Sequence, residues 1–444
     1  PMSGMAFWMR RLLPCLGIIM TKRNAPQVDT FGCRLNIWES EVIRDKAASA
    51  GLQDAIIFNT CAVTSEAEKQ ARQAIRKARR ENPDSQIIVT GCAAQIAAEN
   101  WVKMDEVDVV LGNHDKLQDQ SWLDLGSAPA SETGYDDRRE GTAAEVVSDI
   151  MQVREMASHM LDGFQEHTRA FLQIQQGCDH RCTFCIIPSM RGDLVSRPVG
   201  SVLDEAKRLK AAGVKELLVI SQDTSAYGVD VKHRTGFWDG MPVKTHMQQL
   251  CEKLGEMGIW VRLHYVYPYP HVDDLIPLMN EGKILPYLDI PFQHANKRIL
   301  RLMKRPGSAD RTLERVKKWR EACPSLVIRS TFIVGFPGET EEEFEMTMEA
   351  VRNVRFDLIY SFKYSARPGT RAAEYPEHLA ENVKSERLKR LLETQEKIVR
   401  EKNKALTGSL QEVLIEGKHH RKENTATGRT RGYHSVSIKD CRTK

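Results

Sequence analysis

The sequence lacks the features that define several large protein classes. Its 444 residues contain no run approaching the roughly 18 apolar residues that a membrane span requires. Its charge is nearly balanced, with 64 Lys and Arg against 60 Asp and Glu, so the net charge of +4 does not by itself indicate nucleic-acid binding. It has no internal repeat and no low-complexity segment. The composition therefore excludes a membrane protein, a coiled-coil rod and a disulfide-stapled miniprotein.

The composition that is present belongs to a globular protein. Hydrophobic residues make up 41% and charged residues 28% of the chain, and its length predicts about three domains. The apolar stretch near residues 12–20 mimics a secretory signal, but residues 21–27 are hydrophilic and contain no small-x-small cleavage site. We therefore expect residues 1–24 to be a disordered extension and the protein to be cytoplasmic. Its ten cysteines then favour metal binding or catalysis over disulfides.

Residues 25–125 alternate short apolar runs with helical stretches. The runs at 55–58, 87–89 and 109–112 predict buried parallel strands, and residues 66–81 predict a charged helix between two of them. This alternation indicates an α/β domain with an open, doubly wound sheet. Residues 126–165 are polar and rich in turn-forming residues, so we expect a linker there.

A second β/α series occupies residues 166–380. Its strand candidates are 170–173, 216–221, 260–266, 287–290, 327–334 and 358–364. Six units predict a partial (β/α)6 barrel rather than the closed eight-fold barrel. Residues 381–408 predict one long connecting helix with an apolar stripe. The tail, residues 409–444, predicts a small β module with strands at 410–415 and 435–438 around a Gly/Thr/Arg turn region.

One cysteine motif has a specific and closely spaced pattern. Cys178, Cys182 and Cys185 stand in a C-x3-C-x2-C loop directly after the first barrel strand, where barrel active sites form. Three thiolates cannot close a tetrahedral zinc site, but they can hold three irons of a [4Fe–4S] cluster and leave the fourth iron open to a chelating substrate. The alternatives are a zinc knuckle completed by His180, or simple surface thiols.

A second set of cysteines is spread over the leading domain. Cys33, Cys61 and Cys92 each follow a strand or a strand-like run. Because the carboxyl ends of parallel strands meet at one edge of a sheet, these residues can converge where ligands bind. Spacing alone nevertheless favours three buried small hydrophobic residues.

The sequence from Gly177 to Cys185 resembles the signature of the radical S-adenosylmethionine (SAM) enzymes. The resemblance implies that SAM is chelated by the open iron and cleaved reductively to a deoxyadenosyl radical, so the three cysteines would be catalytic. It also implies that Phe184, the aromatic residue before the last cysteine, lies by the adenine. Polar groups at later strand ends, among them Gln222, Arg329 and Gly335, are expected at the same mouth and to bind this cofactor.

Both cysteine sets, a flavodoxin-like leading domain and a β tail together are similar to the methylthiotransferases. This resemblance covers the chain from about residue 26. It implies an auxiliary [4Fe–4S] cluster on Cys33, Cys61 and Cys92, and a SAM cluster on the C-x3-C-x2-C loop. One SAM would methylate a sulfur at the auxiliary cluster and a second would yield the radical, converting C–H to C–SCH3. A monomer is expected, reduced by a donor such as flavodoxin or ferredoxin.

The two halves are similar to different branches of this family. The leading domain, at residues 30–36 and 71–82, is similar to the branch that modifies N6-threonylcarbamoyladenosine beside the tRNA anticodon. The barrel, at residues 221–228 and 264–270, is similar to the branch that modifies an aspartate of a ribosomal small-subunit protein. A non-catalytic iron–sulfur electron carrier is an alternative from another class, disfavoured because a carrier needs no open barrel mouth.

The tail favours tRNA as the substrate. It is similar to the TRAM module, a small β-barrel that grips substrate, and its shortness predicts a truncated version of that module. Residues 416–444 carry eight Lys and Arg against three acidic residues, a local charge of +5. Such a basic surface is the footprint expected for phosphate contacts, here through Arg429 and Arg431. We therefore expect a tRNA substrate, with the ribosomal protein as the alternative.

Overall fold

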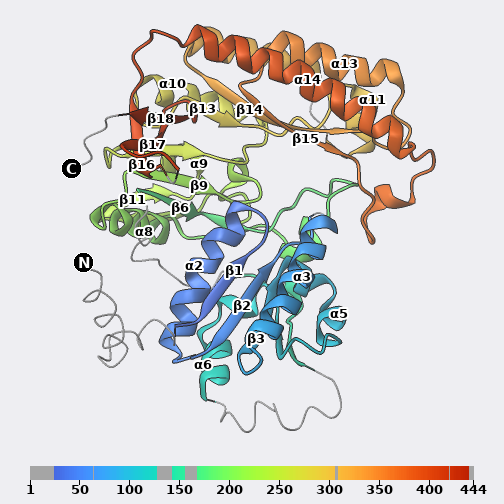
Figure 1. Cartoon of the computed structure of the whole chain (residues 1–444). Coiled ribbons are helices and arrows are strands. Elements are labelled where there is room, and N and C mark those ends of the chain that lie inside the picture. The colour runs from blue at the N-terminus through green and yellow to red at the C-terminus, as the bar shows by residue number, and fades with distance from the viewer. Residues whose placement is uncertain are drawn as a thin grey trace, which may run out of the picture. The chain divides into compact units, whose positions relative to one another are not determined.

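The computed structural model describes residues 25–63, 65–127, 143–155, 168–305, 309–419 and 421–439. These residues form two compact units, one up to Val153 and one from Arg154 onward (Figure 1). The expected extension over 1–24 lies outside the described residues. None of the helices in these ranges is long and apolar enough to cross a membrane.

The first unit contains a five-stranded, fully parallel sheet. Its strands, which stand in consecutive order, are β1 (Gln27–Thr30), β2 (Ala55–Thr60), β3 (Gln86–Gly91), β4 (Val109–Leu111) and β5 (Ala144–Val146). The central strands read as continuous Ile, Val and Phe runs because both of their faces are buried. β5 lies inside the expected linker. All three of its residues are exposed, so no apolar run marked it as a strand.

Helices cover both faces of this sheet. They include α2 (Arg34–Ser49), α3 (Ser65–Glu81), α4 (Cys92–Ile96), α5 (Ala98–Val102) and α6 (Asp119–Ser127). Figure 1 shows α2 on one side of the strands and α3 with α5 on the other, where Arg72 lies 4.2 Å over the Trp101 ring. This confirms the doubly wound α/β arrangement. The strand order differs from that of flavodoxin in one respect, since β1 is at the edge here and the first strand of flavodoxin lies between its second and third.

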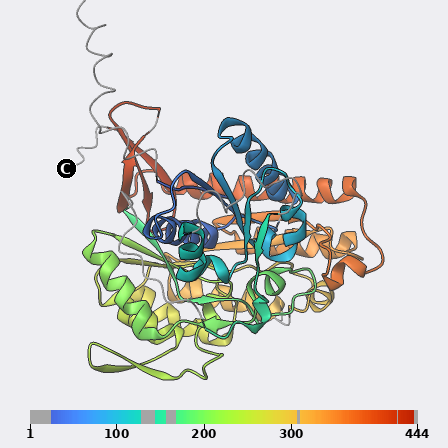
Figure 2. The ribbon, with the colours of Figure 1, turned by 90° about the horizontal axis from the view of Figure 1, so that it is seen from below.

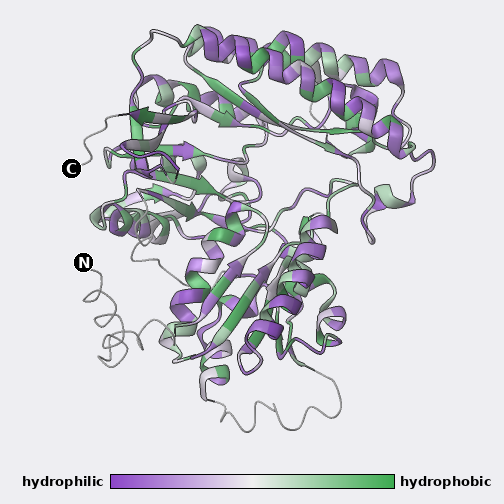
Figure 3. Ribbon diagram, in the orientation of Figure 1, coloured by the Kyte–Doolittle hydropathy of each residue, from purple (hydrophilic) through white to green (hydrophobic). Residues whose placement is uncertain are grey.

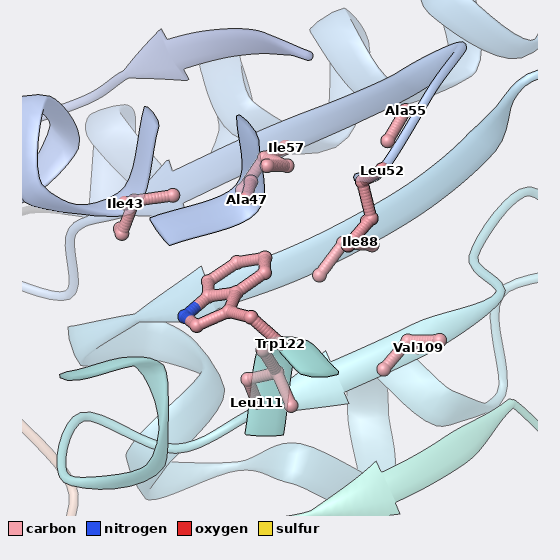
Figure 4. Close-up of a cluster of buried hydrophobic side chains, with 9 residues drawn as sticks. All are labelled: Ile43, Ala47, Leu52, Ala55, Ile57, Ile88, Val109, Leu111 and Trp122. Carbon is pink, nitrogen blue, oxygen red and sulfur yellow. The ribbon is translucent and has the colours of Figure 1, made fainter. Parts of the chain in front are cut away.

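One apolar cluster joins α2, α6 and the sheet (Figure 4). Its members are Ile43, Ala47, Leu52, Ala55, Ile57, Ile88, Val109, Leu111 and Trp122. Fully burying a side chain of this size stabilises a fold by about 1.5–3 kcal/mol relative to leaving it exposed. The strands are therefore held firmly below their carboxyl ends, where the three cysteines of this unit follow.

The second unit is built on six parallel strands. They form two three-stranded sheets, the first with β6 (Arg169–Gln173), β9 (Glu216–Ile220) and β12 (Trp260–Leu263), the second with β13 (Tyr287–Asp289), β14 (Val327–Val334) and β15 (Leu358–Lys363). Two backbone hydrogen bonds of 2.8 Å, Leu285 N to Val261 O and Val266 N to Asp289 O, connect the two sheets. The expected partial (β/α)6 barrel is confirmed.

Helices cover the outside of these strands. The longer ones are α8 (Val199–Ala211), α9 (Met247–Gly255), α12 (Ala309–Ala322), α13 (Glu341–Val354) and α14 (Glu381–Ala405). Figures 1 and 2 both show α14 running beside α13 and β15. Its apolar stripe buries Leu391 and Ile398, and its other side is polar, as the alternating colours of Figure 3 show. α14 begins at the same residue as the expected connecting helix and ends three residues before it.

The tail folds into a three-stranded antiparallel sheet. Its strands are β16 (Val413–Lys418), β17 (Thr425–Thr430) and β18 (Ser435–Lys439). β17 replaces the expected turn region. It is the central strand although it is polar, because Thr425, Ala426 and Thr430 are buried and paired on both sides. The tail docks at the amino ends of the barrel strands, where Thr168 Oγ1 donates to Ile415 O at 3.0 Å.

Candidate functional site

The cysteine loop of the barrel is held by a close backbone approach. Gly177 has a φ of +75°, and a Cβ there would lie 1.8 Å from the carbonyl oxygen of Asp193. Glycine is therefore required for the loop to lie against residues 192–194. Cys178 N donates to Gly192 O at 3.2 Å, and Asp179 Oδ1 accepts from Leu194 N at 2.8 Å. These contacts fix the first cysteine before any metal binds.

The other end of the loop is anchored to later barrel segments. Thr183 donates from its hydroxyl to Leu302 O at 2.8 Å and accepts at its carbonyl from Ala372 N at 2.9 Å. Phe184, beside it, packs against a buried cluster of Ile299, Met303, Phe336, Tyr364 and Ala372. The ring expected beside the adenine is thus fixed among apolar side chains at the carboxyl ends of β14 and β15.

His180 does not complete a zinc knuckle in this structure. Its Nε2 lies 3.0 Å from Asp223 Oδ2 and 2.9 Å from the Tyr269 hydroxyl, and its ring stacks on Tyr267 with centroids 4.4 Å apart. Among the described residues, no group of three His, Cys, Asp or Glu side chains is placed to hold a single metal ion. The donor set of three cysteines instead suits a cluster, which separates its ligands more widely.

Burial favours the protonated form of two of the barrel thiols, those of Cys178 and Cys185. Desolvation raises the pKa of Cys178 to about 12 and that of Cys185 to about 11. A thiol must lose its proton to bind iron, so the assembly of a cluster at this loop would release protons. The positive charge of the irons would then offset the energetic cost of burying thiolates.

The barrel encloses polar atoms that have no hydrogen-bond partner among the described residues. They include both amide atoms of Gln222, the side-chain oxygen of Gln293, Nη1 of Arg329, and Nε and Nη2 of Arg367. A buried polar group without a partner costs about 1–3 kcal/mol. These atoms are therefore suited to polar ligands, and the amino, carboxylate and ribose groups of SAM are of the kind that some of them could bind. Arg367 was not predicted, since only its Pro-Gly neighbours stand out in the sequence.

Of two other expected cofactor residues, Arg329 lies earlier in its strand than predicted, whereas Gly335 follows its strand as predicted. Arg329 was expected at a strand end, but it is the third residue of β14, in register with Asp289 and 3.4 Å from its Oδ1. Its guanidinium lies 4.1 Å over the Tyr360 ring. Gly335 does follow β14, yet its amide donates to Glu339 Oε2 at 2.6 Å, so in this structure it forms part of a turn.

The structure brings the three cysteines of the first unit to one sheet edge. β1, β2 and β3 are paired so that Thr30 lies opposite Asn59 and Thr60 opposite Gly91, which places Cys33, Cys61 and Cys92 just beyond neighbouring strand ends. A Cβ on Gly32 would lie 2.8 Å from Cys61 Sγ. The loop bearing Cys33 therefore passes directly over the Cys61 thiol.

A second glycine permits the turn at Cys92. Gly91 has a φ of +97°, and a Cβ there would lie 2.4 Å from Thr60 O. The two strand-to-helix turns thus pack backbone against backbone, with one cysteine after each. This convergence favours the cluster interpretation of these cysteines over three isolated apolar residues.

The two tail arginines expected to contact substrate have partners within the protein. Arg429 Nε lies 2.9 Å from Glu416 Oε1, and its guanidinium lies 4.7 Å over the Tyr433 ring. Arg431 Nη1 lies 3.1 Å from Glu412 Oε2 and its guanidinium 5.9 Å over the Trp260 ring. These contacts join the tail strands to one another and to the barrel, so both side chains, although partly exposed, already have acidic and aromatic partners within the protein.

The fold and the cysteine loop define a radical SAM enzyme, and comparisons with known proteins agree. Residues 172–351 match the radical SAM superfamily, and residues 26–112 match an uncharacterized protein family, UPF0004. The structure of the radical SAM methyltransferase TsrM from Kitasatospora setae is similar in fold, with a TM-score of 0.53 and 15% identity over 77% of this chain and 69% of that one.

Curated relatives identify the family. The chain is 56% identical over 395 residues to the ribosomal protein uS12 methylthiotransferase RimO of Alteromonas mediterranea, covering 87% of this chain and 77% of the relative. The proteins of that name from Proteus mirabilis and Aeromonas hydrophila are 50% and 48% identical, over 87% and 92% of this chain and 85% and 89% of their own. The chain belongs to the methylthiotransferase family of radical SAM enzymes.

Family membership makes the protein a transferase and excludes the iron–sulfur electron carrier as an interpretation. It implies a [4Fe–4S] cluster and SAM as cofactors. The similarity also bears on the expectation that the two halves of the chain resemble different branches of the family. A match over 92% of the chain is longer than the barrel and tail together, so the similarity to these relatives extends into the leading domain.

Proposed function

We propose that this protein transfers a methylthio group to an aspartate of ribosomal protein uS12. The observation that carries the proposal is the similarity to uS12 methylthiotransferases, which reaches 56% identity and extends into the leading domain. This proposal replaces the expected tRNA substrate. The relatives described above are all named for action on ribosomal protein uS12, and none is named for action on tRNA. The tail is compatible with the replacement, because Arg429 and Arg431, although partly exposed, are paired with Glu416 and Glu412, which offset their charge.

Each of the two units would hold one of the two clusters. Cys178, Cys182 and Cys185 would hold the SAM cluster, and Cys33, Cys61 and Cys92 would hold a second, auxiliary [4Fe–4S] cluster. Bound SAM and the clusters supply the methyl group, the sulfur chemistry and the radical that an unactivated C–H bond requires. The barrel positions the reacting groups and excludes water. Phe184 would cover the adenine, and Gln222 and Arg329 would hold the polar groups of SAM.

The substrate test offers the enzyme both candidates. We expect anaerobically reconstituted protein, supplied with SAM and reduced flavodoxin or ferredoxin, to add one methylthio group to recombinant uS12. Tandem mass spectrometry would place the group on a single aspartate. A tRNA carrying threonylcarbamoyladenosine should remain unmodified under the same conditions. Modification of the tRNA and not of uS12 would overturn the proposal while leaving the reaction class intact.

Arg367 is proposed to bind the carboxylate of the target aspartate. It follows β15 at the barrel mouth, five residues before Ala372, which bonds the cysteine loop. Two of its nitrogens are enclosed without a partner, and a guanidinium suits a carboxylate in charge and geometry. We expect Arg367→Met to raise the KM for uS12 about tenfold to a hundredfold, since a charged hydrogen bond contributes about 1.5–3 kcal/mol.

The control for this variant is Arg301→Met, an exposed arginine on α11 (Lys297–Leu302) that should leave the KM unchanged. Deoxyadenosine formed without uS12 reports on SAM binding alone, and it should be the same in both variants. Loss of that uncoupled SAM cleavage in Arg367→Met would assign the residue to SAM and contradict its role toward the substrate.

A further inference from the structure

A buried polar network lies beneath the cysteines of the first unit. It consists of Glu39 on α2, Asn36 one turn before it, Asn59 on β2, and Asn113 and Lys116 after β4, which we call the Lys116 network. All five side chains are fully enclosed, with exposures of 0%. Lysine and glutamate are seldom buried completely, and such burial is stable only when every charge is paired.

The ammonium of Lys116 is fully satisfied within this network. Its Nζ lies 2.8 Å from Glu39 Oε2, 2.7 Å from Asn113 Oδ1 and 3.2 Å from Asn59 Oδ1. The three acceptors come from three separate segments of the chain. One positive charge therefore fixes the relative positions of α2, β2 and the segment that follows β4.

The amides held by Lys116 lead to two of the three cysteines. Asn113 Nδ2 lies 3.8 Å from Cys92 Sγ, as a donor to the sulfur. Asn59 Nδ2 donates to Asn36 O at 2.9 Å, and the side chain of Asn36 lies 3.8 Å from Cys33 Sγ. The side-chain oxygens of Asn59 and Asn113 both accept from Lys116, so their side-chain nitrogens point away from the ammonium. The nitrogen of Asn113 faces Cys92, and that of Asn59 faces the backbone of Asn36.

Stability alone does not account for this network. Replacing a buried ion pair by apolar side chains of similar volume is commonly neutral or stabilising, because the pair must first be desolvated. The fold would therefore tolerate an apolar core here, continuous with the cluster of Ile43, Ala47 and Trp122. A buried positive charge that reaches Cys92 through a single amide suggests a role toward what the thiolates hold.

We infer that Lys116 is a positioning residue for the auxiliary cluster, which holds its cysteine ligands in place and raises its reduction potential. This inference rests on the proposed function, because it assumes a cluster on Cys33, Cys61 and Cys92. Cluster potentials depend on net charge, on hydrogen bonds to sulfur and on burial. In an enclosed site the ammonium is weakly screened, so it favours the reduced, more negative state of the cluster. The carboxylate of Glu39 acts in the opposite direction.

The test uses two single substitutions of opposite electrostatic sign. Both are made in the full chain with Cys178, Cys182 and Cys185 replaced by alanine, so that only the auxiliary cluster contributes to the signal. Lys116→Met removes the positive charge and should shift the midpoint potential of the cluster to a more negative value. Glu39→Gln removes the negative charge and should shift it to a more positive value. Potentials are read by redox titration followed by electron paramagnetic resonance.

Shifts of the midpoint potential in opposite directions separate this role from a purely structural one. A purely structural role would lower the iron content of both variants but would not shift their potentials in opposite directions. The matched control is Lys77→Met on the exposed side of α3, where the same charge is lost and no shift is expected. If Lys116→Met fails to retain iron, the positive shift in Glu39→Gln still decides the question. Equal potentials in Glu39→Gln and the parent overturn the inference. A parent that binds no iron would instead refute the two-cluster proposal, and the inference with it.

Discussion

Replacing Cys178, Cys182 and Cys185 by alanine is expected to abolish deoxyadenosine formation and to reduce the bound iron from about eight to about four atoms per chain. The three residues share one short loop, held by Gly177 and Thr183 whether or not metal is present. Without the open iron, SAM has no chelating site and cannot be cleaved reductively. Iron analysis and chromatography of the nucleoside products measure the two effects.

The control for this variant is the iron that remains. It should give the spectrum of an intact [4Fe–4S] cluster, because the residual cysteines belong to a separate compact unit. Full iron content in the triple variant would show that the loop does not hold a cluster. Continued deoxyadenosine formation would contradict the assignment of SAM to that loop.

Replacing Cys33, Cys61 and Cys92 by alanine should abolish methylthio transfer while reductive SAM cleavage continues. The sheet edge that bears these residues lies in the first unit, and the barrel belongs to the second. We therefore expect loss of about half the iron, no methylthiolated uS12, and deoxyadenosine at the rate of the unsubstituted enzyme. Mass spectrometry of uS12 and the nucleoside assay give the two readouts in one reaction.

Folding must be shown to be intact in this second variant. Cys61 and Cys92 are buried, so their replacement by the smaller alanine leaves space at the sheet edge. The comparison variant Cys251→Ala removes a buried cysteine on α9, far along the chain from either set, and should keep all iron and activity. Methylthio transfer that survives loss of all three residues would refute the auxiliary cluster.

The fold was predictable where buried elements have a continuous apolar pattern in the sequence. The six barrel strands and α14 were expected within a few residues because their apolar runs or stripes are continuous. β17 was missed because Thr425–Thr430 is paired on both sides yet made of Thr, Ala, Gly and Arg. The hairpin of β10 (Thr235–Trp238) and β11 (Met241–Lys244) was also missed, although its Asp239-Gly240 turn is a recognised hairpin signal.

Both cysteine sets were predicted, the first from its spacing and the second from its place after strands together with the resemblance to a family. The C-x3-C-x2-C spacing by itself indicates cluster chemistry, whereas the second cysteine set needed the strand register to bring it together. Lys116 and Arg367 carry no motif, and their significance depends on burial that a sequence does not display. The substrate expected from the tail lacks support for a related reason. A local charge of +5 counts arginines without revealing that two of them pair internally.

Tyr433 has consequences for how tails can be exchanged within such a family. Its ring lies 4.7 Å from the guanidinium of Arg262 and 5.1 Å from that of Arg169, and Arg262 Nη1 donates to Arg431 O at 2.8 Å. Arg262 and Glu216 form a fully enclosed pair beneath the barrel. A foreign tail would remove these contacts of Arg262 and Arg169, so an exchange of tails that keeps the fold intact is expected to need matching residues at the amino ends of the barrel strands.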